Sequence, residues 1–204
     1  KRLWFSQGTN FSTNADDELP QDTLLKYKKS IVLYGPPGTS KSYIARELAK
    51  NLIGSSFAKT LEDSTNKQND FSAFRNALCY IYEEKKKDEN YSGIPHIHRL
   101  QLHPGYTYDD FIVGRTIKEK SVETQKGYLM RLIDEINNDR KTDTSYAKLP
   151  HILILDEINR VDISRVFGEL FTAMEKDYRD TGVDLPVKGK NDEVLKLQVP
   201  KDLY

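Results

Sequence analysis

The sequence has a single cysteine, no long apolar run and no excess of charge of either sign, and each absence excludes a class of protein. Cys79 cannot form a disulfide within the chain, so we expect a reducing compartment, the cytoplasm. No apolar run approaches the roughly 20 residues that span a bilayer, and no signal segment stands at the start, so we expect no membrane partner. The 31 basic and 31 acidic residues cancel, whereas a strong nucleic-acid platform carries a basic excess.

The length and composition fit a globular domain. The chain has 204 residues, of which 37% are hydrophobic and 30% charged, which suffices for a sizeable core. It begins at Lys1 rather than at a methionine, so we expect a piece of a longer protein. Residues 1–24 are polar and are expected to form an N-terminal lead-in, and residues 25–204 are expected to form the folded domain.

Two short apolar runs with helical patterns between them predict the fold class. Residues 31–34 and 152–155 are apolar and β-branched, which is typical of buried parallel strands. We expect helices over residues 41–53, 71–87, 128–137 and 163–176, a strand over 98–102 and a hairpin within 183–204. Gly54 is expected to end the first helix. Strands that alternate with helices favour a three-layer α/β fold with a mostly parallel sheet.

The most informative segment is GPPGTSKS, residues 35–42, which directly follows the first strand and opens a helix. It matches the phosphate-loop pattern G-x-x-x-x-G-K-[ST], except that Ser40 replaces the glycine before the lysine. Backbone N–H groups at a helix N-terminus carry partial positive charge and bind anions. Lys41 would contact the β- and γ-phosphates, and the Ser42 hydroxyl would bind Mg²⁺. The alternative is a Gly-Pro turn that only connects strand and helix.

The complete set of residues that we expect around the nucleotide phosphates is Gly35, Pro36, Pro37, Gly38, Thr39, Ser40, Lys41, Ser42 and Tyr43. Ser40 keeps the backbone N–H that such a loop uses. Its side chain would stand close to the phosphates and could weaken their binding.

The second strand ends in two carboxylates, Asp156 and Glu157. In open α/β sheets, ligands bind at the carboxyl edge of the strands, which is where this pair is expected to lie. Asp156 is expected to hold the Mg²⁺ shell, and Glu157 to orient and activate the attacking water. The alternative is a buried strand that simply ends in polar residues.

Histidine, aromatic and acidic residues between the two strands are further candidate site residues. They are His96, His98, His103, Tyr106, Tyr108, Phe111, Asp109 and Asp110. No cysteine or carboxylate cluster completes a metal site with the histidines. Aromatic anchors that hold a loop to the core are favoured over base-stacking residues, and a solvated loop or helix cap is favoured over an acidic catalytic pair.

Five stretches together resemble a known family. The first two are LYGPPGT (residues 33–39) and LDEINR (155–160), and the others are LHPGYTYDDFIVG (102–114), SRVFGEL (164–170) and VPKDLY (199–204). They resemble the AAA+ motor subunit of McrBC-type modification-dependent restriction systems, over roughly residues 25–204. The third stretch is similar to the family segment H-x-x-Y-x-Y-E-D-F-x-x-G, and the last looks like the approach to the family's sensor strand.

The resemblance implies the large subdomain of an AAA+ P-loop NTPase, truncated before the sensor strand and the helical lid. Such motors form rings, usually hexamers, with nucleotide between subunits. They hydrolyse GTP or ATP with Mg²⁺ to drive an McrC-like nuclease on DNA with modified cytosine, which other domains contact. Lys41 and Glu157 would be catalytic, and Asn159 and Arg160 would lie near the nucleotide or a neighbouring subunit. Since the sensor and arginine finger would follow Tyr204, we expect this segment alone to hydrolyse nucleotide poorly or not at all.

Two other functions are consistent with the same motifs. One is an ATP-dependent remodelling protein of the MoxR-like kind, which acts on proteins and has no nuclease partner. The other is a nucleotide-gated scaffold, in which Ser40 has abolished nucleotide hydrolysis and only nucleotide binding remains. The choice between GTP and ATP also stays open.

Overall fold

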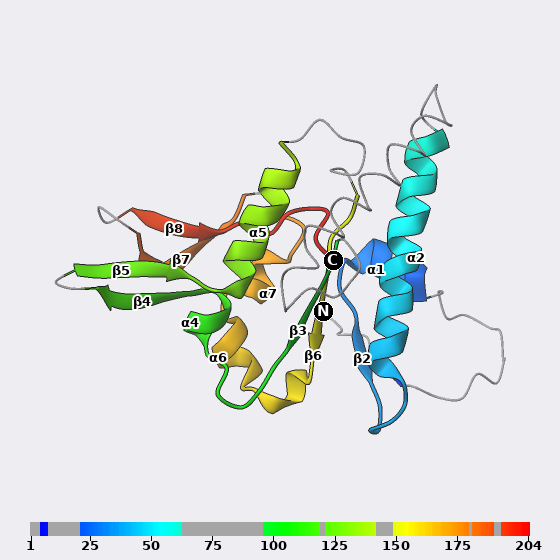
Figure 1. Cartoon of the computed structure of the whole chain (residues 1–204), viewed down its shortest axis with the longest axis horizontal. Helices are drawn as coiled ribbons and strands as arrows, with labels where there is room; N and C mark the ends of the chain where they lie inside the picture. The colour runs from blue at the N-terminus through cyan, green and yellow to red at the C-terminus, as the bar shows by residue number, and fades with distance from the viewer. Residues whose placement is uncertain are drawn as a thin grey trace. The chain divides into compact units, whose positions relative to one another are not determined.

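The computed structural model describes residues 5–7, 21–62, 96–118, 121–141, 149–179, 181–189 and 193–204 (Figure 1). The helix expected over residues 71–87 lies outside this described part. The chain divides into two compact units, and each is described by itself. Unit 1 comprises residues 1–99, 148–154 and 202–204, and unit 2 comprises residues 100–147 and 155–201.

Unit 1 begins with the strand–loop–helix arrangement expected from the sequence. Its first elements are β1 (Phe5–Gln7), α1 (Gln21–Lys28), β2 (Val32–Tyr34) and α2 (Lys41–Glu62). Strands β1 and β2 pair in parallel. The end expected for α2 at Gly54 is wrong, because the helix continues to Glu62. Glycine costs a helix only about 1 kcal/mol, and both the burial of Phe57 and the bonds from the Ser55 and Ser56 hydroxyls to the Leu52 carbonyl favour continuation.

Strands β3 (Ile97–Gln101) and β6 (Ile152–Asp156) form a parallel pair. The Ile152 N–H donates to the His96 carbonyl, and the Leu102 N–H donates to the Asp156 carbonyl, so both strands run in the same direction. The strand expected over residues 98–102 is thus confirmed within one residue at each end.

The last three residues of the chain lie along the other edge of β6. The N–H groups of His151 and Leu153 donate to the carbonyls of Asp202 and Tyr204, and the bridge between His151 and Leu203 is parallel. Successive N–H groups of a strand point to opposite edges, so β6 lies between this segment and β3. The Tyr204 hydroxyl accepts a 2.6 Å hydrogen bond from Lys29 Nζ, just before β2.

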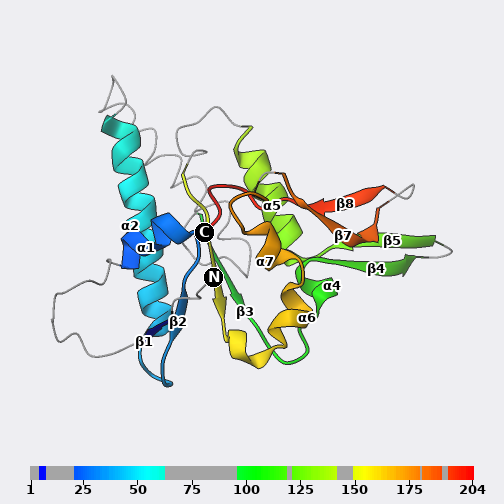
Figure 2. The ribbon, with the colours of Figure 1, turned by 180° about the vertical axis from the view of Figure 1, so that it is seen from behind.

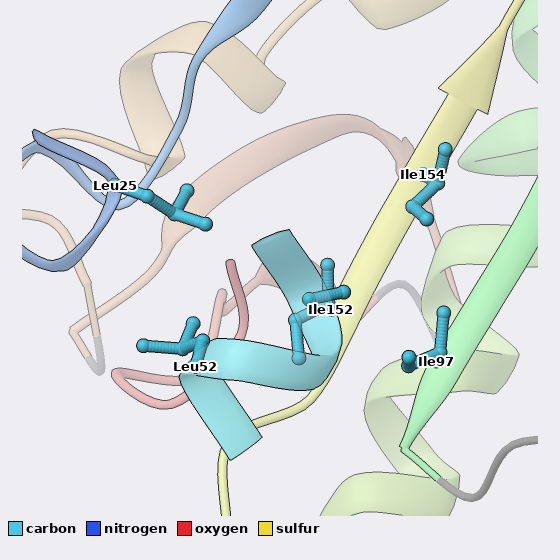
Figure 3. Packing of buried hydrophobic residues seen from close by; sticks show 6 residues of the cluster. Leu25, Leu52, Ile97, Ile152 and Ile154 are labelled. Atoms are coloured by element: carbon cyan, nitrogen blue, oxygen red, sulfur yellow. The ribbon is translucent and has the colours of Figure 1, made fainter. Parts of the chain in front are cut away.

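The core of unit 1 joins α1 and α2 to the β3–β6 pair. Figure 3 shows Leu52 of α2 near Ile152 of β6, with Ile97 on the neighbouring strand. The buried cluster is Leu25, Ala49, Leu52, Ile97, Ile152 and Ile154. Burial of a large aliphatic side chain contributes about 1.5–3 kcal/mol, so this cluster holds α2, and with it the loop before α2, against the sheet.

Unit 2 is built from short helices and two antiparallel hairpins. Its elements are α4 (Tyr108–Phe111), β4 (Val113–Lys118), β5 (Ser121–Lys126), α5 (Tyr128–Asp139), η2 (Ile158–Arg160), α6 (Ile163–Phe167), α7 (Leu170–Ala173), β7 (Val183–Lys188) and β8 (Val194–Leu197). The structure confirms α5 and the β7–β8 hairpin, whereas β4–β5 was not expected. The hairpins run side by side in both views (Figures 1 and 2), and the Thr124 hydroxyl donates to the Lys188 carbonyl at 2.9 Å.

The single helix expected over residues 163–176 is wrong, because Gly168 divides it into α6 and α7. Gly168 has φ 38° and ψ −116°, which is outside the helical region. The Tyr108 ring occupies the place that a side chain at this position would need, 2.9 Å from an ideal Cβ. Packing against α4 therefore overrides the helical periodicity of the sequence. The described elements form an α/β fold with parallel strand pairs and two antiparallel hairpins.

Candidate functional site

The loop between β2 and α2, residues 35–40, is a turn that leads directly into the helix. Gly38 and Ser40 both have left-handed φ angles, of 80° and 57°. When left-handed residues alternate with right-handed ones, successive backbone N–H groups converge into a concavity that binds anions. The Ser40 carbonyl accepts from the Ile44 N–H at 2.9 Å, so the first turn of α2 opens directly from this loop.

Lys41 turns its ammonium group back into the loop. Its Nζ donates to the carbonyls of Gly35 and Pro36 at 2.9 and 2.7 Å, and lies 3.3 Å from the Thr39 hydroxyl. The Thr39 hydroxyl in turn donates to the Pro36 carbonyl at 2.8 Å. Ionised phosphate oxygens are stronger acceptors for an ammonium group than carbonyls are. The loop therefore holds a cation where a polyphosphate can replace the carbonyl contacts.

Ser40 is exposed and holds a conformation that favours glycine. For a residue with a Cβ, the left-handed region costs about 1–2 kcal/mol. The serine therefore holds a backbone conformation that glycine adopts without strain, and it does so at the expense of backbone strain.

The acidic pair stands at the end of β6, as expected. The Asp156 carbonyl is bonded to the Leu102 N–H at 2.9 Å, which fixes the end of the strand. Glu157 follows with φ 58° and ψ 38°, a left-handed conformation that turns the chain into the short helix η2. Non-glycine residues in this region cluster at functional sites, because the surrounding structure must hold them there.

Arg160 contacts Glu157 twice. Its backbone N–H donates to the Glu157 carbonyl at 2.9 Å, and its Nε donates to Glu157 Oε2 at 3.1 Å. Both side chains are exposed, so the ion pair contributes only about 0–1 kcal/mol. The sequence indicated a place near the nucleotide for Arg160 and did not indicate this pairing with the carboxylate.

The predicted nucleotide residues fall into both units. The phosphate-loop residues from Gly35 to Tyr43 belong to unit 1, and Asp156, Glu157, Asn159 and Arg160 belong to unit 2. The two residues expected to share Mg²⁺, Ser42 and Asp156, are therefore divided between the units.

The aromatic and acidic residues of 103–111 hold α4 in place. Phe111 is fully buried and packs edge-on against Phe167 at 4.9 Å, which confirms an aromatic anchor. Thr107 and Asp110 form a reciprocal capping box, which confirms the helix-cap interpretation of Asp110. Hydrogen bonds from Thr107 hold the pKa of Asp110 below its usual value. Burial, with a smaller effect of the Asp110 charge, raises the pKa of Tyr106 to about 12.

Two of the three candidate histidines lie with a fourth that the sequence analysis missed. His98 Nε2 is 3.2 Å from His151 Nδ1, and the rings of His96 and His151 are 4.0 Å apart. His103 instead packs edge-on against Tyr106. Over the described ranges, no three His, Cys, Asp or Glu side chains are arranged to hold a metal ion. In the same ranges, no helix combines the length and apolar character needed to cross a bilayer.

Comparison with known proteins finds one matching protein family and one similar protein. The AAA domain of the dynein-related subfamily matches residues 96–196, which include the acidic pair and the β4–β5 hairpin. The chain is also 26% identical over 186 residues to the Type IV methyl-directed restriction enzyme EcoKMcrB subunit of Escherichia coli (strain K12). That alignment spans 90% of this chain, and therefore includes the phosphate loop, but only 31% of the relative.

Proposed function

Because this chain is McrB-like and has the P-loop fold of an AAA+ domain, we propose that it binds and hydrolyses a nucleoside triphosphate as part of a motor for DNA restriction. The observation that carries the proposal is the loop of residues 35–42, with Lys41 held inside it by the Gly35 and Pro36 carbonyls. In this proposal, the phosphate loop and the acidic pair act on the same nucleotide.

The loop supplies binding. Its N–H groups and Lys41 take the β- and γ-phosphates, and Lys41 exchanges two carbonyl contacts for phosphate oxygens. The Ser42 hydroxyl and the Asp156 carboxylate are hard oxygen donors of the kind that Mg²⁺ accepts, so this pair suits the ion. When bound, Mg²⁺ would neutralise negative charge on the phosphates.

The acidic pair supplies catalysis. Glu157, which follows β6 in a left-handed backbone conformation, orients the attacking water and accepts its proton. Asn159 and Arg160 follow within the same turn, and Arg160 holds the Glu157 carboxylate. The rate enhancement comes from positioning and electrostatics, without a covalent intermediate.

The partners are proposed from the McrB-like character of the chain. The first partner is further copies of the chain, in a ring that the family resemblance makes a hexamer. The others are an McrC-like nuclease subunit, and DNA held by other parts of the whole protein. The cytoplasm is the compartment in which such a system would act. Because the chain spans less than a third of its restriction relative, these features belong to the whole protein.

Nucleotide competition on the full-length protein tests the proposal. GTP and ATP compete with a fluorescent analogue in Mg²⁺, and turnover is followed in the same samples. Lys41→Ala should weaken binding by at least about tenfold, since a hydrogen bond to a charged group contributes about 1.5–3 kcal/mol. The matched control is Lys50→Ala on the same helix, an exposed lysine paired with Glu47, and it should bind normally.

The outcomes separate the alternatives. GTP preference with turnover supports the restriction motor, and ATP preference favours a MoxR-like remodelling protein. Binding without turnover identifies the nucleotide-gated scaffold. In that case the strained Ser40 would be the departure from the motif that accounts for the lost hydrolysis. If Lys41→Ala and Lys50→Ala bind nucleotide equally well, the phosphate loop is not the binding site.

A further inference from the structure

Within unit 2, two distant stretches of sequence form one joint. These stretches, residues 107–114 and 162–169, contain α4 and α6 respectively, and the two helices are in contact. One stretch leads into the β4–β5 hairpin, and the other directly follows the acidic pair. The joint therefore lies between the hairpin and the residues to which catalysis is assigned above.

The hairpin is clamped onto α4 at both of its ends. A Cβ at Gly127, just after β5, would lie 2.5 Å from the Phe111 carbonyl carbon, and the Gly127 N–H donates to the Ile112 carbonyl at 2.7 Å. A Cβ at Gly114, within β4, would lie 2.6 Å from the Asp109 side chain. Both contacts are too close for any larger residue, so the base of the hairpin and α4 form one rigid piece.

Helix α4 is attached in turn to the break between α6 and α7. The Tyr108 hydroxyl donates to Glu169 Oε2 at 2.8 Å, in a partly buried position. Its ring fills the space beside Gly168, and Phe111 packs edge-on against Phe167. Burial and the Glu169 carboxylate both raise the pKa of Tyr108, so the hydroxyl keeps its proton and remains the donor.

Helix α6 continues the connection to the acidic pair. Its N-cap is Asp162, whose carboxylate accepts from the Arg165 N–H at 3.2 Å and the Ser164 hydroxyl at 2.7 Å. Only Val161 separates this cap from η2, which ends at Arg160. A change in the conformation of Glu157 and Arg160 is therefore passed to α6, which begins only a few residues later. From the end of α6 it reaches Tyr108, through the contacts of Tyr108 with Gly168 and Glu169.

We propose that Tyr108 and Glu169 are positioning residues that couple the nucleotide state of the acidic pair to the β4–β5 hairpin. This coupling rests on the proposed nucleotide function. Nucleotide at the acidic pair shifts η2 and α6, the Tyr108–Glu169 hydrogen bond carries the shift to α4, and the clamped hairpin follows. The conformation of the β4–β5 hairpin thereby depends on the nucleotide state, and the hairpin transmits this state to the substrate of the motor.

Hydrogen exchange of the full-length protein tests the coupling. Exchange of the hairpin amides, residues 113–126, is compared with and without a non-hydrolysable nucleotide analogue and Mg²⁺. In the wild type we expect saturating nucleotide to change these rates by about fivefold or more, the usual lower range for coupled sites. Tyr108→Phe keeps the ring beside Gly168 but removes the hydroxyl, and it should abolish most of the response.

Further variants distinguish coupling from a merely structural role. Glu169→Gln retains an acceptor oxygen for Tyr108 and should restore part of the response that a Glu169→Ala variant loses. Tyr106→Phe is the matched control, because the Tyr106 hydroxyl makes a long, 3.5 Å contact with the Asp110 carbonyl, four residues along the same stretch. Tyr108→Phe should also lower kcat while leaving the KM for nucleotide within about twofold, since coupling concerns the step after binding.

The results separate this inference from the function on which it rests. If the wild type binds no nucleotide, both are overturned. If nucleotide binds and the hairpin does not respond, or if the response survives Tyr108→Phe, the coupling alone is overturned. A response lost in Tyr108→Phe and kept in Tyr106→Phe supports it.

Discussion

Replacement of Ser40 by glycine is expected to stabilise the protein, because the loop already has the backbone of a glycine at this position. Ser40 has φ 57° and is exposed, so its side chain contributes little packing. Relief of the left-handed conformation is worth about 1–2 kcal/mol. The greater freedom of glycine in the unfolded chain opposes this by about 0.5–1 kcal/mol. The net expected gain is about 0.5–1 kcal/mol.

Ser40→Ala is the matched control for this prediction, because alanine keeps the Cβ and the strain but removes the hydroxyl. Urea unfolding of the nucleotide-free protein should therefore place Ser40→Gly about 1 kcal/mol above Ser40→Ala in free energy of unfolding. Nucleotide affinity of Ser40→Gly, measured by competition, should equal or exceed that of the wild type. A glycine variant no more stable than the alanine variant would refute the argument from backbone strain.

Four further substitutions test the packing and ionisation described above. Gly127→Ala should cost about 3 kcal/mol or more from overpacking against the α4 backbone, whereas Gly54→Ala, with open space around it in α2, should gain about 1 kcal/mol in the same urea titration. Leu52→Ala should lose about 2–5 kcal/mol from the core of unit 1, and a smaller loss would mean that this core is loosely packed. Tyr106 has a pKa raised to about 12, mainly by burial, against about 10 in the unfolded chain. Its contribution to stability is thus complete below pH 10 and lost as the pH rises toward 12, and Tyr106→Phe should flatten the unfolding free energy over that range.

Local signals in the sequence predicted the parts of the fold that depend on neighbouring residues. The two apolar runs became β2 and β6, but the expectation that both are fully buried is wrong for β2, whose residues are half-buried or exposed, with Tyr34 64% exposed. Helix α5 extends two residues beyond its expected end, with its apolar residues buried as the spacing predicts. The phosphate loop was recognisable because its glycines and lysine occupy fixed positions between a strand and a helix.

Contacts between distant residues decided what the sequence could not predict. The break at Gly168 depends on the Tyr108 ring, 60 positions earlier, and no local pattern encodes it. Hairpin β4–β5 was missed because its sequence has no apolar–polar alternation, and because Gly114 within β4 and Gly127 after β5 were not recognised as contact points with α4. The pairing of Glu157 with Arg160 lies within one turn, and their three-residue spacing was a signal that could have revealed it.

The central claim is that the phosphate loop and the acidic pair act on one nucleotide, and Glu157→Gln tests it most directly. In the full-length protein with Mg²⁺, nucleotide binding and turnover are measured in the same sample, with Glu47→Gln, a partly exposed carboxylate on α2 paired with Lys50, as control. We predict that Glu157→Gln binds with unchanged affinity and turns over about 100-fold or more slowly, the usual effect of losing a general base. Turnover at the wild-type rate would contradict the claim and separate the acidic pair from the nucleotide site.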